Sequence, residues 1–145
     1  MSIVNPNEID PIRKMFDAVK GKQIENIHLS NEVDLSLVRE EQVKIDNELI
    51  EADTFADPNQ TFTRFVMNNY LFAIMSESTP AEQMRELSDL LDGKGDPHGY
   101  ISAQVKKYSE DGKRNQHSTT VSVQQFGVKQ LKIASGLERL NTQLH

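Results

Sequence analysis

The chain has 145 residues, of which 37% are apolar and 26% are charged, and its net charge is −6. A chain of this length can bury roughly two-thirds of the surface of its unfolded state in one core, and the absence of cysteine excludes disulfides, thiolate metal sites and cysteine nucleophiles. No secretory signal is visible, and the longest apolar run, Tyr70 to Met75, is far shorter than the roughly 20 residues that span a bilayer. We therefore expect a cytoplasmic protein without a membrane span, and leave open its export by a dedicated secretion route.

Charge is distributed unevenly along the chain. Residues 1–92 carry 8 basic and 18 acidic side chains, a net charge of −10, whereas residues 93–145 carry 8 and 4, a net charge of +4. Opposite charges favour docking within the chain, head-to-tail association of copies, or attraction of an acidic partner. We divide the chain into an acidic helical core (1–92), a segment with a glycine-rich hinge, a short helix and a polar loop (93–118), and a C-terminal amphipathic helix (119–145).

The first predicted helix covers residues 11–20, with Asp10 as its cap, an apolar stripe of period 3.6, and Gly21 as its end. Residues 22–35 give mixed signals and are interpreted as a loop. Residues 36–52 place apolar side chains on one face and predict a second helix, with a short strand at Val43 to Ile45 as the alternative.

The segment 60–75 is apolar almost all round, which is typical of the buried central helix of a bundle. Asn68 and Asn69 interrupt it, and each would need hydrogen-bond partners if buried. Residues 79–82, Thr-Pro-Ala-Glu, fit a capping box that begins another helix, which ends at Gly93.

Gly93, Gly95, Pro97 and Gly99 follow in close succession and indicate a hinge. We expect a short helix over residues 100–109, a polar loop over 110–118, and a last helix from about Thr120, with a short extended entry at Val121 to Val123 as the alternative. Together the segments predict an all-α fold, a small irregular helical bundle with a heptad-patterned C-terminal helix.

The last helix carries a heptad-like stripe, here called the seam. Its members are separated alternately by three and four residues, which is the spacing of helices that pack knobs into holes. The seam residues are Val123, Phe126, Gln130, Ile133, Leu137, Leu140 and Leu144. Gln130 is the polar member and can fix register or partner choice, while Gly127 and Gly136 each cost about 1 kcal/mol relative to alanine. The helix therefore needs a partner surface, either in its own chain or in another protein.

Motifs for chemistry are missing. The four histidines share no metal-ligand spacing, the segment around Asp92 and Asp96 lacks the glycine and glutamate of a calcium loop, and Gly93-Lys94-Gly95 departs from a phosphate-binding loop. No cofactor and no metal site are expected. The carboxylates that cluster between residues 46 and 57 are interpreted as a solvated helical face; they are Asp46, Glu48, Glu51, Asp53 and Asp57.

The basic residues Lys106, Lys107, Lys113 and Arg114 form a small patch on an otherwise acidic chain of pI 5.2, which argues against nucleic acid as the partner. We expect a non-enzymatic protein-interaction or assembly subunit, structural, secretion-related, virion-type or regulatory, that acts by helix packing of its C-terminal segment on a protein partner or a second copy. The alternatives are a nucleic-acid-associated regulator that uses the basic patch, and a small enzyme without a recognisable motif.

Overall fold

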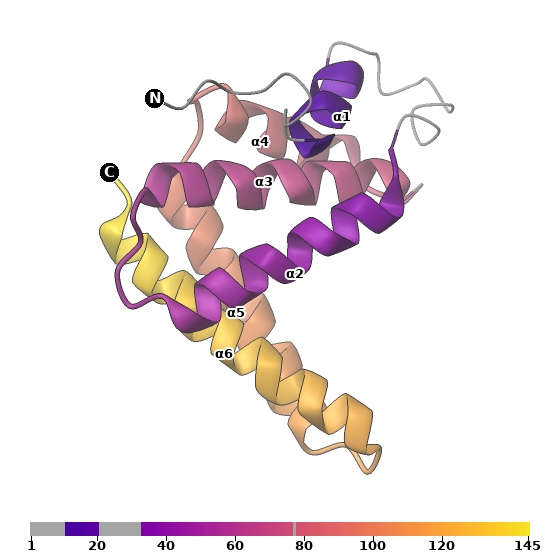
Figure 1. Cartoon of the computed structure of the whole chain (residues 1–145), viewed down its shortest axis with the longest axis vertical. Helices are drawn as coiled ribbons and strands as arrows, with labels where there is room; N and C mark the ends of the chain where they lie inside the picture. The colour runs from indigo at the N-terminus through magenta and orange to yellow at the C-terminus, as the bar shows by residue number, and fades with distance from the viewer. Residues whose placement is uncertain (1–10, 21–32, 77) are drawn as a thin grey trace, which may run out of the picture. The chain divides into compact units, whose positions relative to one another are not determined.

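The computed structural model describes residues 11–20, 33–76 and 78–145, and these form six α-helices and no strand. The predicted all-α fold is confirmed for this part of the chain. The helices, labelled in Figure 1, are α1 (Pro11–Lys20), α2 (Leu35–Glu51), α3 (Pro58–Met75), α4 (Ala81–Leu91), α5 (Pro97–Gln116) and α6 (Val121–Gln143). The expected cap at Asp10, the expected end at Gly21 and most of the loop expected over 22–35 lie outside the described residues.

The described residues group into two compact units. Unit 1 takes its residues from Met1–Val43 and Arg64–Lys94, and unit 2 from Lys44–Thr63 and Gly95–His145. Helices α2 and α3 each continue from one unit into the other. In this division, residues 44–63 group with the C-terminal part of the chain.

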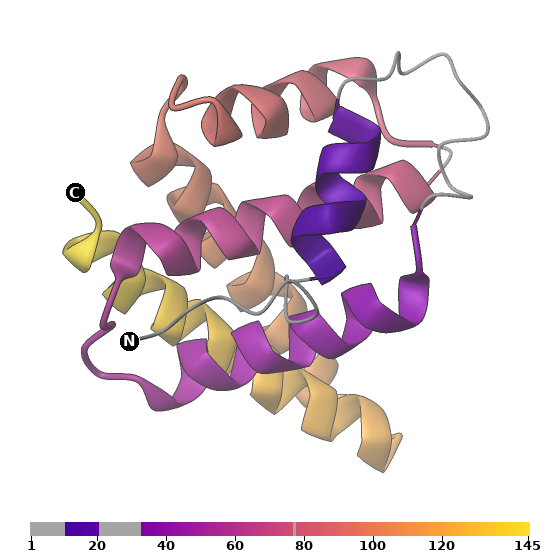
Figure 2. The same cartoon turned by 45° about the horizontal axis from the view of Figure 1, so that its top comes forward.

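Unit 1 is held together by the apolar faces of α1, α3 and α4. Figure 2 shows α1 lying across α3, and there the ring of Phe16 packs edge-on against Tyr70 with the ring centroids 5.4 Å apart. At the end of α1, Lys20 Nζ lies 3.1 Å from Asp92 Oδ1, and this ion pair joins α1 to the residue that follows α4. Met84, Leu87 and Leu90 form the buried stripe of α4.

Asn68 lies in the core of unit 1 and is fully buried. The expected hydrogen bonds are present on one side of its amide: Nδ2 donates to the backbone oxygen of Val38 at 3.2 Å and to Gln42 Oε1 at 3.1 Å. Its Oδ1 has no partner among the described residues. The amide therefore fixes α2 against α3 at this level, since a slip of either helix would leave its donor unpaired as well.

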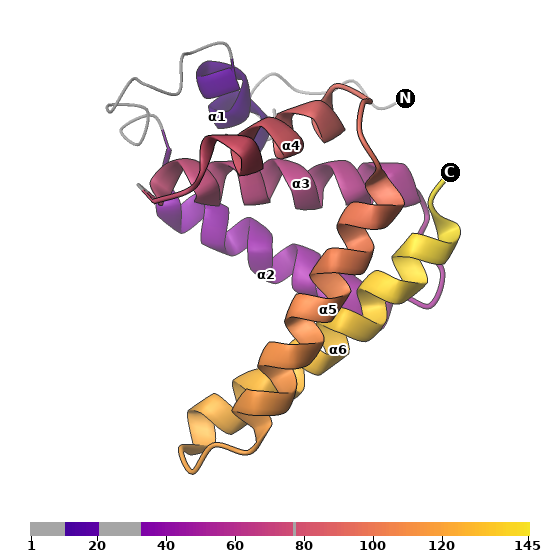
Figure 3. The same cartoon turned by 180° about the vertical axis from the view of Figure 1, so that it is seen from behind.

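Unit 2 contains a hairpin of α5 and α6, which run side by side in Figures 1 and 3, together with the end of α2 and the start of α3. Its fully buried side chains include Ile45 and Leu49 of α2, Ile101 of α5, and Leu137 of α6. Phe62 of α3 packs edge-on against Tyr100 of α5, with centroids 6.4 Å apart.

Polar side chains begin α3 and α5. Asp57, which precedes Pro58, accepts a hydrogen bond from Gln60 N at 3.1 Å. Asp96, which precedes Pro97, accepts one from Gly99 N at 3.0 Å. In both cases a carboxylate satisfies an amide of the first turn, and proline occupies a position that needs no amide hydrogen.

The capping box predicted at residues 79–82 is wrong. The Thr79 hydroxyl donates instead to the carbonyl oxygen of Ala73, at 3.0 Å, and α4 begins at Ala81 without a side-chain cap. Carbonyl groups in the last turn of a helix retain acceptor capacity, and the Ala73 oxygen, which also accepts from Ser76 N at 3.2 Å, uses it for the Thr79 hydroxyl. The strand considered at Val43 to Ile45 is also wrong, because these residues lie within α2.

The polar segment 110–118 is helical as far as Gln116 rather than a loop. Glu110, Lys113 and Arg114 are exposed, whereas Gly112 is buried and Asn115 is half-buried. The extended entry considered at Val121 to Val123 is also wrong, because α6 is helical from Val121 onward. Both segments belong to the same hairpin, whose packing can favour helix over local preference.

Candidate interaction surface

The seam on α6 divides into two parts that differ in burial. Five members are buried in unit 2, and we call them the inner seam residues: Gln130, Ile133, Leu137, Leu140 and Leu144. The other two, Val123 and Phe126, are exposed by 36% and 53%, and we call them the distal seam residues. The inner part of the stripe therefore packs within the chain, whereas the distal part lies open.

Gly136 lets the inner part of α6 approach the end of α2. A Cβ atom on Gly136 would overlap the backbone carbonyl group of Leu49, so only glycine allows the two helices to lie this close. The glycine that weakens the isolated helix is thus required by its packing. Side chains from Lys129 to Gln143 of α6 contact the end of α2 and the segment that follows it.

Arg139 caps the C-terminal end of α2. Its Nη2 donates to the carbonyl oxygens of Leu49 at 2.8 Å and Ile50 at 3.3 Å, and its Nε donates to the carbonyl oxygen of Ala52 at 3.1 Å. The last carbonyl groups of a helix have no partners within it and carry partial negative charge, so a guanidinium group stabilises them.

Gln143 fixes the segment that follows α2. Its side-chain amide donates to the carbonyl oxygen of Asp53 at 2.7 Å, and its Oε1 accepts from the backbone amide of Phe55 at 2.8 Å. Both bonds are to main-chain atoms, which every residue has, so no sequence pattern indicates them. Neither Arg139 nor Gln143 was identified by the sequence analysis.

Within the hairpin, glycine again sets the distance between helices. A Cβ on Gly127 would overlap the backbone at Asn115 and Gln116, and a Cβ on Gly112 would overlap Leu131. The polar seam residue Gln130 accepts a hydrogen bond from Asn115 Nδ2 at 2.8 Å. Its expected role in register is thus matched by a partner on α5, inside the chain.

The first two turns of α6 expose most of the large apolar side chains on the protein surface. Of the five exposed large apolar residues in the described part of the chain, four lie here: Val121, Val123, Phe126 and Val128. The fifth is Val43 on α2. This concentration is the clearest candidate interaction surface, because exposed apolar side chains gathered on one segment often mark a binding site.

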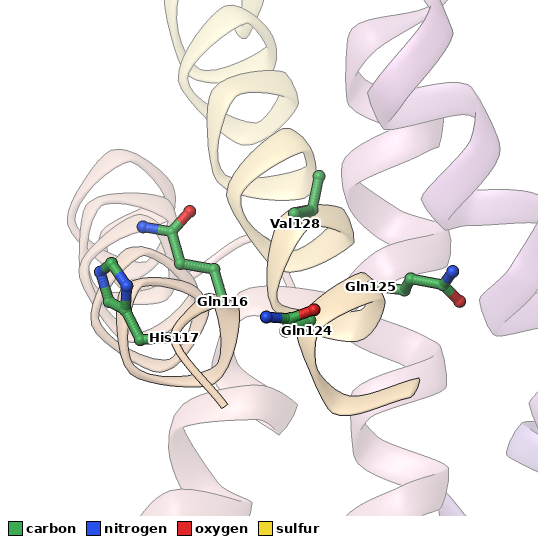
Figure 4. A pocket seen from close by; sticks show the side chains of 5 residues that line it. All are labelled: Gln116, His117, Gln124, Gln125 and Val128. Atoms are coloured by element: carbon green, nitrogen blue, oxygen red, sulfur yellow. The ribbon is translucent and has the colours of Figure 1, made fainter. Parts of the chain in front are cut away.

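A shallow open depression lies beside this surface, at the end of the hairpin. Figure 4 shows its lining side chains, which come from the end of α5 and the start of α6: Gln116, His117, Gln124, Gln125 and Val128. Amide groups and one imidazole border the single valine. Such a hollow can accept polar groups next to an apolar contact, but it does not enclose a ligand.

The predicted basic patch lies on one helix. Lys106 and Lys113 are seven residues apart, as are Lys107 and Arg114, so the four side chains share the outward face of α5, and all four are exposed. Arg114 Nη2 lies 2.5 Å from Asp111 Oδ1, which offsets its charge.

The carboxylates interpreted as a solvated face do not all face water. Asp46 is buried, with its Oδ2 3.8 Å from Lys129 Nζ, and Glu48 is half-buried and accepts a hydrogen bond from the Thr61 hydroxyl at 2.7 Å. Both lie on the part of α2 that belongs to unit 2. Glu51, Asp53 and Asp57 are exposed, as expected.

Tyr108 on α5 has a strongly raised pKa. Burial, with smaller contributions from Asp46, Tyr100 and Asp111, raises its pKa to about 12. A phenol with a raised pKa stays neutral at physiological pH, and this shift reflects the packing of Tyr108 in unit 2.

The described part of the chain comprises residues 11–20, 33–76 and 78–145. In these ranges no three side chains of the ligating types come together as a metal site. In the same ranges, no helix combines the length and apolarity needed to cross a bilayer. His98 Nδ1 lies 2.6 Å from Asn141 Oδ1, which links α5 to α6.

Comparison with known proteins returned no match among family models, curated proteins or solved structures.

Proposed function

We propose that the protein is a non-enzymatic interaction or assembly subunit whose contact surface is formed by the distal seam residues. The observation that carries the proposal is the abrupt change in exposure along one stripe of α6, from Leu137 at 0% to Phe126 at 53%. Both residues obey the same spacing of three and four, so they lie on the same face of the helix.

The distal seam residues have the spacing of residues that pack between the side chains of a facing helix, but they are exposed. Val123 and Phe126 continue the stripe that Ile133 and Leu137 bury, but they lie nearer the hairpin turn than the links from Lys129 to Gln143. Burying a valine or phenylalanine side chain contributes about 1.5–3 kcal/mol. A partner that covers both residues would therefore gain at most about 3–6 kcal/mol from them, and the rest of its binding free energy must come from contacts with the side chains around them.

The partner that best fits this surface is a helix with its own apolar stripe. It can belong to a second copy of the chain or to another protein, because helix packing needs only side chains at matched spacing. The inner seam residues do not take part, since they are already buried. Of the seven seam residues expected to form the interface, only the two distal seam residues are therefore proposed to contact a partner.

Sedimentation velocity over a range of protein concentrations tests the proposal. We expect the chain to associate, and the double variant Val123→Ser, Phe126→Ser to remain monomeric with an unchanged melting temperature, because both side chains are exposed. The matched control is Val43→Ser, which alters an equally exposed valine on α2. Truncation after Ser118 is unsuitable, because it would remove the buried residues of α6.

If the chain is monomeric at every concentration, self-association is excluded and a different protein must supply the helix. Association that both Val43→Ser and the distal double variant weaken equally would contradict the proposed surface.

A further inference from the structure

We propose that the first two turns of α6 bind the surface of a lipid bilayer that carries anionic headgroups. The proposal goes beyond the protein-interaction function and does not depend on it, because it also needs Val121 and Val128, two exposed residues that lie outside the seam.

Apolar side chains occupy two opposite faces of these turns. Val121 and Val128 are seven residues apart and share one face, with exposures of 63% and 44%. Val121 lies two residues before Val123, which places it about 200° around the helix axis from the seam. A packed helix covers one face of its partner, so a protein bound to the seam would leave Val121 and Val128 in water. A medium that surrounds the turns covers both faces.

Charge on the same segment points to an anionic medium. Between Asp111 and Glu138 the sequence has no acidic residue, whereas it has four basic ones: Lys113, Arg114, Lys129 and Lys132. Two of them are compensated, Arg114 by Asp111 and Lys129 by Asp46. Lys113 and Lys132 are exposed. Cations beside an apolar segment are what the negative surface potential of an anionic bilayer attracts.

The spacing suits shallow insertion at the headgroup level. Lys132 follows Val128 by four residues, about 6 Å along the helix, which is within the Debye length of about 8 Å at physiological salt. Gln124 and Gln125 lie between the apolar residues and are exposed, so they would stay at the polar interface. A short apolar segment with cations and amides close by is typical of interfacial binding and not of a membrane span.

Single-tryptophan variants test whether both faces enter the lipid. The chain has no tryptophan, so Phe126→Trp and Val128→Trp each introduce one reporter, on opposite faces of α6. We expect both to show a blue-shifted emission with vesicles of phosphatidylglycerol and phosphatidylcholine, and neither to shift with phosphatidylcholine alone. No shift with the anionic vesicles would overturn the proposal, and so would a shift from Phe126→Trp alone.

Co-sedimentation with the same vesicles tests the residues. We expect Val121→Ser, Val128→Ser to lower the partition coefficient at least about tenfold, and Lys113→Gln, Lys132→Gln to lower it by a similar factor and to reduce its dependence on salt. The matched controls, Val43→Ser and Lys44→Gln, change exposed residues of α2 and should bind like the parent chain.

Equal binding to neutral and anionic vesicles would overturn the proposal, as would equal loss from the controls. It would also be overturned if the chain bound duplex DNA through Lys113 and Lys132 but did not bind vesicles. The proposed protein contact is tested on Val123 and Phe126 in lipid-free buffer, so either proposal can fail while the other holds.

Discussion

Gly136 of α6 lies so close to Leu49 of α2 that a methyl group on Gly136 would overlap the Leu49 carbonyl group. The contact ties the inner half of α6 to the protein's own core and is reinforced by the hydrogen bonds of Arg139. The two halves of the C-terminal helix therefore differ in what they pack against. Its inner half packs within the chain, and its distal half carries the proposed contact surface.

Gly136→Ala should destabilise the protein although alanine is the better helix former. We expect a loss of about 1–3 kcal/mol in the free energy of unfolding, because α2 and α6 must move apart. Urea denaturation measures it, with Glu138→Ala on the exposed face of α6 as the control. A gain of about 1 kcal/mol, as helix propensity alone predicts, would show that the close contact is absent.

Arg139→Met should expose the end of α2 by removing three charge-assisted hydrogen bonds while keeping most of the aliphatic side chain. The expected loss is about 1–3 kcal/mol, and Arg139→Lys should restore part of it. Lys132→Met, a matched change at an exposed site on the same helix, should have little effect. Hydrogen exchange would also become faster in the last turn of α2, and unchanged exchange there would contradict the capping role.

The bond between Asn115 and Gln130 can be tested by a double-mutant cycle. Asn115→Ala and Gln130→Ala should each destabilise the hairpin, and the double variant should lose less than the sum, with a coupling of about 0.5–1.5 kcal/mol. Additive losses in chemical denaturation would mean that the 2.8 Å contact contributes nothing to stability.

Stability should fall in strong alkali partly because of Tyr108. Burial raises the pKa of its hydroxyl to about 12, from an ordinary value of 10.0, so the folded chain holds this proton where the unfolded chain releases it. The resulting stability is complete below about pH 10 and is lost as the pH rises toward 12, by at most about 1.4 kcal/mol per pH unit. Tyr108→Phe should show a shallower decline over this range, and identical slopes for the two proteins would refute the assignment.

Helix positions were predictable because their signals are local. Periodicity and proline placed α1 at its observed limits, and α2 and α3 within two residues of theirs. Thr79 shows the limit of this reasoning, because its hydroxyl bonds to Ala73 although its own segment matches a capping motif. Gly112 shows another limit: a polar stretch that looked like a loop is helical where it packs against α6.

The candidate surface was only partly predictable. The spacing of three and four residues identified the seam. It could not show that the seam is buried by the rest of the chain as far as Gln130 and is exposed at Phe126. Arg139 and Gln143 bond to main-chain atoms far away in sequence, and such contacts leave no pattern. The exposure of Val121 and Val128 likewise depends on the hairpin ending where it does.

Site-specific photo-crosslinking along α6 tests the central claim most directly. A photoreactive phenylalanine analogue is placed in turn at Val123, Phe126 and Glu138, and at Ala103 on the exposed face of α5. We predict intermolecular products to the same protein, a second copy or a distinct partner, from positions 123 and 126 and none from 138 or 103. Products of equal yield from all four positions, or from none of them, would contradict a contact surface at the distal seam residues.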